Sequence, residues 1–188
     1  RRRGMYRSAE LAPLEGVRLE RAEVVDLTGD GPLDLVHGTA DGELAFWVNT
    51  GTAQLPAWAL DASLFGGVLD AGGASSPFFH DLDGDGDQDL VSGSQLGAIR
   101  HWENVGTPAA PAWRADHAPS AAIDVSIYSA IAVGDVDADG LADAVIGDLD
   151  GQLFLYRNTG DGFVADPGPL AGADVGAWSV PRLVDLDR

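Results

Sequence analysis

Cysteine is absent from the 188-residue chain, which excludes disulfide bonds, structural zinc sites built on thiolates and thiol catalysis. Lysine is absent too, so 11 arginines stand against 30 acidic residues and the formal net charge is −19. A protein of that charge is repelled by nucleic acids and anionic membranes, and we expect neither as a partner. No apolar run approaches the roughly 20 residues of a membrane-spanning helix, so no membrane insertion is expected.

The acidic residues are unevenly divided, with 24 aspartates and only six glutamates. Glutamate solubilises a surface equally well and is the better helix former. The shorter aspartate is preferred in tight loops, where its carboxylate accepts backbone hydrogen bonds or binds hard cations. The composition therefore indicates aspartate-rich loops.

Three segments of the chain, beginning at Val24, Phe79 and Val133, align without gaps. In each, an aspartate is followed by glycines 12 and 16 residues later and by an asparagine 23 residues later. The equivalent residues are Asp26, Asp81 and Asp135; Gly38, Gly93 and Gly147; Gly42, Gly97 and Gly151; and Asn49, Asn104 and Asn158. The steps between units are 55 and 54 residues, and a fourth unit opens at Asp185.

Short apolar runs separated by Gly, Asn and Asp turns fill each unit, and no helical periodicity is present. In the first unit the pattern predicts a hairpin of two strands, Leu33–Val36 and Leu44–Val48, joined by a GxxxG turn. The strand before each aspartate loop is expected at Val24 and Val25, at Phe78 and Phe79, and at Ile131–Val133. The outer strands are expected around Trp58, Trp113 and Phe163.

Four antiparallel strands per repeat are typical of a β-propeller blade, so the sequence predicts an all-β protein made of such blades. At about 54 residues each, the chain holds about three and a half blades, whereas four to eight usually close a propeller. We expect a partial propeller completed by the same longer chain or by a second copy; the alternative is an open, solenoid-like array. The expected divisions are the last strand of a preceding blade at 1–16, blades at 17–70, 71–122 and 123–170, and the first strand of a following blade at 171–188.

The loop DLDGDGDQD of the second unit has aspartates at positions 1, 3, 5 and 9, and a glycine at position 6 where the chain must turn sharply. Alternate side chains of such a loop converge, the position 7 carbonyl turns inward, and oxygen ligands at about 2.3–2.6 Å suit Ca²⁺. Transition metals prefer imidazole or thiolate. The predicted ligands are Asp81, Asp83, Asp85, Asp87 (carbonyl) and Asp89 in the second unit, and Asp135, Asp137, Asp139, Leu141 (carbonyl) and Asp143 in the third.

The first and fourth units depart from this pattern. The first offers Asp26, Thr28, Asp30, Pro32 and Asp34 at positions 1, 3, 5, 7 and 9, so one carboxylate is replaced by a neutral ligand. The fourth supplies only Asp185 and Asp187. We therefore predict two calcium sites, a third with fewer charges and a truncated fourth. None is an EF-hand, because position 12 lacks the bidentate glutamate and no helix flanks the loop.

Aspartate-glycine clusters also occur as plain hydrophilic turns, and this alternative applies most to the first unit. Four carboxylates that converge without a cation repel one another, and the second and third units share the arrangement at identical offsets. The repetition favours metal binding over turns in those two units.

The DxDxDGxxD loop that runs into an apolar strand, followed by GxxxG and NxG, resembles the FG-GAP and VCBS repeats of integrin-α-like β-propellers over nearly the whole chain. No literal FG…GAP string occurs. In that family the loop joins the first two strands of a blade and binds Ca²⁺. The resemblance implies a segment of a larger extracellular or cell-surface protein that acts as an adhesion or interaction scaffold for a protein or glycan ligand. The alternative is a lectin, or an accessory propeller of a polysaccharide-active enzyme.

Catalysis is not expected, because the chain shows no Ser/His/Asp arrangement, phosphate-binding glycine loop or glutamate pair. The four histidines occupy unrelated positions of the repeat. Trp47, Trp102 and Tyr156 are equivalent, which favours packing in the core over a sugar-binding platform.

Overall fold

The computed structural model describes residues 21–65, 69–123 and 125–184. Within these ranges the chain forms twelve strands and no helix, so the all-β prediction is confirmed. It follows that no described helix is long and apolar enough to cross a membrane.

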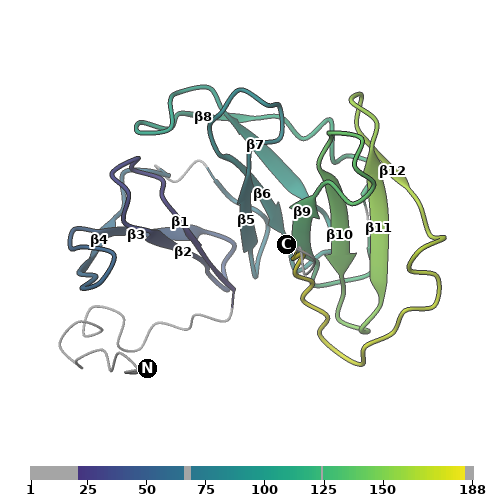
Figure 1. Ribbon diagram of the computed structural model, residues 1–188. Coiled ribbons are helices and arrows are strands. Elements are labelled where there is room, and N and C mark those ends of the chain that lie inside the picture. Colours follow the sequence, from purple (N-terminus) through teal and green to yellow (C-terminus); the bar gives the residue numbers. More distant parts are fainter. Residues whose placement is uncertain (1–20, 66–68, 124, 185–188) are drawn as a thin grey trace, which may run out of the picture.

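The strands form three separate four-stranded antiparallel sheets, each with its strands in sequence order (Figure 1). The first contains β1 (Ala22–Val25), β2 (Asp34–Gly38), β3 (Leu44–Asn49) and β4 (Trp58–Asp61). The second contains β5 (Ser76–His80), β6 (Asp89–Gly93), β7 (Arg100–Asn104) and β8 (Trp113–Ala115). The third contains β9 (Ala130–Gly134), β10 (Asp143–Gly147), β11 (Leu153–Asn158) and β12 (Phe163–Ala165).

The same register recurs in every sheet. The asparagine that ends the third strand lies opposite the aromatic residue that begins the fourth; the pairs are Asn49 and Trp58, Asn104 and Trp113, and Asn158 and Phe163. The predicted outer strands are thereby confirmed. The predicted strand at Leu33–Val36 is shifted, because β2 continues to Gly38, which pairs with Leu44.

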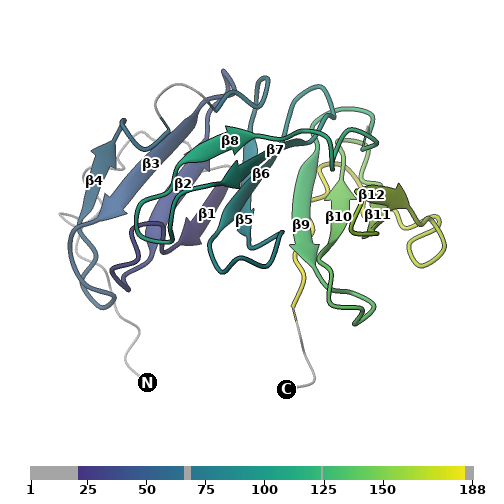
Figure 2. The same ribbon diagram turned by 90° about the horizontal axis from the view of Figure 1, so that it is seen from above.

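The first strands of the three sheets are neighbours, since β1 contacts β5 and β5 contacts β9. In Figure 1 the fourth strands β4 and β12 lie at opposite outer sides, and Figure 2 shows the same succession from above. The second strands are buried along most of their length, as expected where sheets cover both faces. On β6, Leu90 packs in the cluster shared with the first sheet, and the next residue, Val91, packs in the cluster shared with the third.

Glycine is required where each second strand ends, because the backbone that precedes the next unit crosses it there. A Cβ atom on Gly38 would lie 1.8 Å from the carbonyl oxygen of Ser75, and one on Gly93 would lie 2.1 Å from that of Ser129. Gly147 meets Ser179 in the same way, at 2.4 Å. The glycine 12 residues after each loop aspartate therefore leaves the space in which successive units pack closely.

The start of the fourth unit lies beside the first strands. Arg182 Nη2 is 3.4 Å from Glu23 Oε2 of β1, and the Leu183 side chain approaches Gly134 of β9. No strand is assigned among the described residues 171–184. The expected strand at 1–16, and Asp185 and Asp187 of the fourth loop, lie outside the described residues. The unit divisions stay a prediction.

Candidate metal centre

The aspartate loops join the first two strands of each sheet and share one backbone conformation. The position 6 glycines have positive φ angles, 98° at Gly31, 97° at Gly86 and 93° at Gly140. Residues with a side chain rarely adopt this conformation, so glycine permits the sharp turn that the sequence predicts at position 6.

The position 9 aspartate fixes each loop to its sheet. Asp34, Asp89 and Asp143 are no more than 1% exposed. In the second unit, Asp89 accepts hydrogen bonds from the backbone N–H of Leu82, at 2.9 Å, and of Asn104, at 2.9 Å. Asp34 and Asp143 accept from the equivalent backbone groups. This carboxylate therefore ties the loop to the third strand. Burial raises the pKa of Asp89 and of Asp34, although the backbone hydrogen bonds oppose this shift.

The position 1 aspartate organises the loop itself. Asp81 accepts the backbone N–H groups of Gly84, at 2.8 Å, and Gly86, at 3.1 Å. Asp135 accepts those of Ala138 and Gly140, at 2.7 and 3.0 Å. Burial alone would raise the pKa of Asp135, but the backbone donors outweigh it and lower the pKa. These bonds favour the anionic form of the Asp135 carboxylate.

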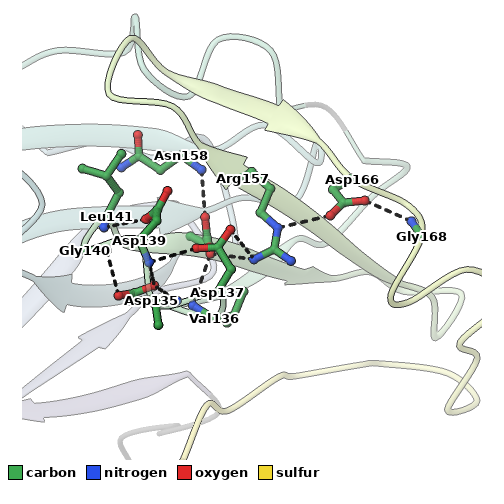
Figure 3. A network of polar contacts seen from close by, with 12 residues as sticks. Asp135, Val136, Asp137, Asp139, Gly140, Leu141, Arg157, Asn158, Asp166 and Gly168 are labelled. Atoms are coloured by element: carbon green, nitrogen blue, oxygen red, sulfur yellow. Dashed lines mark hydrogen bonds and ion pairs between the residues drawn. The ribbon is translucent and has the colours of Figure 1, made fainter.

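Carboxylates from positions 1, 3 and 9 converge in two loops. Each residue of these two groups offers an oxygen within 4.8 Å of the others; the groups are Asp81, Asp83 and Asp89, and Asp135, Asp137 and Asp143. Figure 3 shows the third loop from close by. These acidic clusters could hold a metal ion, and their ligands are the hard oxygens preferred by Ca²⁺ and Mg²⁺.

The position 5 aspartates do not belong to these groups. Asp85 Oδ1 accepts the backbone N–H of Asp87 at 3.0 Å, and Asp139 Oδ1 accepts that of Leu141 at 2.8 Å. In the structure the position 5 aspartate stabilises the loop through this hydrogen bond. The role of the position 5 aspartate as a metal ligand stays a prediction. The same holds for the position 7 carbonyl groups of Asp87 and Leu141.

The Asp87 side chain is buried close to the other carboxylates of the second loop. It is 5% exposed, and its Oδ1 atom has no hydrogen-bond partner. Burial, followed by repulsion from the other loop carboxylates, raises the pKa of Asp87 to about 6. A cation bound beside it would relieve this repulsion.

The first loop brings fewer charges together. Among the described residues, three-acid groups form in the second and third loops and not in the first. Asp26 and Asp34 keep the backbone hydrogen bonds of their counterparts. The Thr28 Oγ1 atom at position 3 is buried and without a hydrogen-bond partner, as expected of an oxygen left for a cation. The participation of Asp30 and Pro32 stays a prediction.

The Arg157 side chain of β11 reaches the carboxylates of the third loop, a contact that the sequence analysis missed. Arg157 Nη1 lies 3.0 Å from Asp143 Oδ2 and 3.3 Å from Asp137 Oδ2, while Nε lies 3.1 Å from Asp166 Oδ2 (Figure 3). The hydrogen bond to Asp166 is the main cause that raises the pKa of Arg157. The second unit has Glu103 at this repeat position. Arg157 therefore already neutralises part of the third loop.

We expect Arg157→Gln to tighten metal binding at the third loop by about tenfold, because a positive charge next to two ligands is removed. The same substitution should lower the thermal midpoint without metal, since the buried Asp143 loses its cationic partner. Isothermal titration calorimetry and thermal unfolding measure the two effects.

The matched control is Arg114→Gln, because Arg114 pairs with Glu103 at the surface and takes no part in the ion pairs of the third loop. It should leave the third loop's affinity unchanged. Weaker metal binding in Arg157→Gln would show that the guanidinium positions the carboxylates instead of competing for them.

The repeated aromatic residues and the histidines lie outside the aspartate loops. Trp47, Trp102 and Tyr156 are 9%, 2% and 8% exposed, which confirms their assignment to the core. Of the histidines, His101 is buried and neither of its ring nitrogens has a hydrogen-bond partner, while its backbone N–H donates to His117 Nδ1. No histidine belongs to either acidic group.

A scan against known families matches the FG-GAP-like repeat model twice, over residues 26–92 and 81–146. Together the two matches cover more than half of the chain and both complete acidic loops. No curated protein matches the sequence.

Proposed function

Since the chain belongs to the FG-GAP-like repeat family, we propose that it is a calcium-stabilised β-propeller segment that serves as an interaction or adhesion scaffold. Three four-stranded sheets with adjacent first strands support the propeller assignment. The blades would correspond to residues 17–70, 71–122 and 123–170, and further blades would come from the longer chain or from a second copy.

The observation that carries the calcium assignment is the convergence of three carboxylates in each of two loops that share the positive-φ glycine at position 6. Ligand chemistry supports calcium, since each group consists of carboxylates alone, without the imidazole that transition metals favour. A flexible loop that also offers backbone carbonyls suits the six to eight ligands of Ca²⁺ better than the strict octahedron of Mg²⁺.

A scaffold outside the cell fits this chemistry. Extracellular modules bind calcium with dissociation constants of about 10⁻⁴–10⁻³ M, so shallow, exposed loops suffice there. Asp83 and Asp137 are exposed in this way. The absence of a catalytic constellation in the sequence supports a role in binding instead of catalysis.

Calcium titration calorimetry tests the proposal. The wild-type protein should bind calcium at two sites of similar chemistry, with weaker binding at the first loop. Asp81→Asn should remove one of the two sites, because it neutralises a member of the second group. Asp41→Asn is the matched control, since this exposed aspartate lies outside the groups and in the turn after β2, at the far end of that strand from the aspartate loop. Absence of calcium binding, or an equal loss in both variants, would refute it.

A further inference from the structure

A pocket of about 660 Å³ lies at the end of the sheets opposite the aspartate loops. The loops lead into the second strands, whereas the pocket includes His37 and the residues that follow β2 at its far end. The lining comes from the turns after β2 and β6 and from the connections before β5, before β9 and after β12, and it includes Arg21, Ala74, Gln95, Tyr128 and Trp178. Its volume is in the range of small-molecule sites.

Backbone strain is concentrated around this pocket. Four described residues other than glycine have positive φ, and three of them line it: Ala74 at 44°, Tyr128 at 56° and Trp178 at 65°. Each donates its backbone N–H to a turn carbonyl of the preceding unit, at 3.0 Å. Glycine would adopt this conformation without strain, so two large aromatic residues at these positions require another reason.

The two aromatic residues form a pair at the pocket. The rings of Tyr128 and Trp178 lie 5.0 Å apart between centroids, and Trp178 is 56% exposed. Gln95 Nε2 donates to the Tyr128 hydroxyl at 3.0 Å, and Arg21 Nη1 donates to the Ser129 carbonyl at 2.9 Å. An exposed indole with polar groups around it offers one apolar face and several hydrogen-bonding groups.

Charge narrows the class of ligand. Among the residues that the structure describes, the lining contains no aspartate or glutamate and includes an arginine, which disfavours a cationic ligand. The net charge of −19 disfavours an anionic one. The class of ligand that remains is an uncharged ring with hydroxyl groups. The apolar face of such a ring can stack on Trp178, and its hydroxyls can form hydrogen bonds with the polar groups of the pocket.

We propose that Arg21, Gln95, Tyr128 and Trp178 form a binding site for an uncharged pyranose of a glycan chain. The site does not depend on calcium chemistry, because none of the loop aspartates that the structure describes lines it. It would give the scaffold a ligand-binding face at the end opposite the proposed metal loops.

Calorimetric titration with four neutral trisaccharides (cellotriose, galactotriose, mannotriose and chitotriose) tests the site. At least one should bind with a dissociation constant below about 10 mM, and Trp178→Ala should weaken it at least tenfold. Gln95→Ala, a substitution of an exposed side chain, should weaken it less and keeps the test valid if Trp178→Ala fails to fold. Val175→Ala is the matched control, since Val175 is exposed on the same connection outside the pocket.

Three results would overturn the proposal: no binding of any trisaccharide, binding that is unchanged in both Trp178→Ala and Gln95→Ala, or tighter binding of trigalacturonate than of every neutral trisaccharide. Asp81→Asn separates this site from the calcium proposal. It should remove a calcium site and leave trisaccharide affinity unchanged, so either proposal can fail alone.

Discussion

Chelation of calcium is expected to lower the thermal midpoint of unfolding by about 10–20 °C. A ligand at 100 times its dissociation constant stabilises the folded state by about 2.7 kcal/mol per site, and two sites give about twice that. For a domain of this size, 1 kcal/mol corresponds to about 2–4 °C. The repulsion among the carboxylates around the buried Asp87 returns when the ions leave, and it is already contained in this loss.

Differential scanning calorimetry at low ionic strength, with calcium or with a chelator, measures this shift. Magnesium in place of calcium is the control, and it should restore only a small part of the midpoint. An unchanged midpoint after chelation would mean that the aspartate loops are plain hydrophilic turns.

The second large effect is expected from Asp89→Ala, which should lower the free energy of unfolding by about 2–4 kcal/mol even in calcium-free protein. The Asp89 carboxylate is 1% exposed and satisfies the backbone N–H groups of Leu82 and Asn104. Its removal leaves these buried donors without partners and detaches the loop from β7. Asp89 is thus structural as well as a proposed ligand.

Asp85→Ala is the matched comparison, because Asp85 belongs to the same loop but is exposed and accepts only the N–H of Asp87. It should cost less than about 1 kcal/mol in a chelator. Urea unfolding of both variants without calcium decides the matter. Equal losses would show that the buried hydrogen bonds of position 9 contribute little.

Most of the local structure is predictable from the repeat. Strand positions follow from alternating apolar residues between Gly, Asn and Asp turns, and Gly86 and Gly140 adopt the sharp turn that their place in the loop indicates. Repetition makes these signals strong, because three aligned units carry the same spacing. The aspartate loops are recognisable in the sequence for the same reason.

The remaining features depend on contacts that spacing does not encode. Positions 5 and 9 carry identical aspartates, and only the fold buries Asp89 and leaves Asp85 exposed. Arg157 reaches the third loop from a neighbouring strand, and its repeat position holds Glu103 in the second unit. Tyr128 and Trp178 stand at equivalent places 50 positions apart, in DVSIYS and DVGAWS, but nothing in this spacing indicates that their rings meet. Such contacts arise when sheets pack together.

Occupancy of the second and third loops by one calcium ion each is tested most directly by a crystal structure of the protein grown with calcium. We predict an anomalous peak in each loop, with carboxylate oxygens of Asp81, Asp83 and Asp89, and of Asp135, Asp137 and Asp143, at about 2.3–2.6 Å. Loops without a peak at millimolar calcium, or ions in octahedral coordination at about 2.1 Å, would contradict the claim.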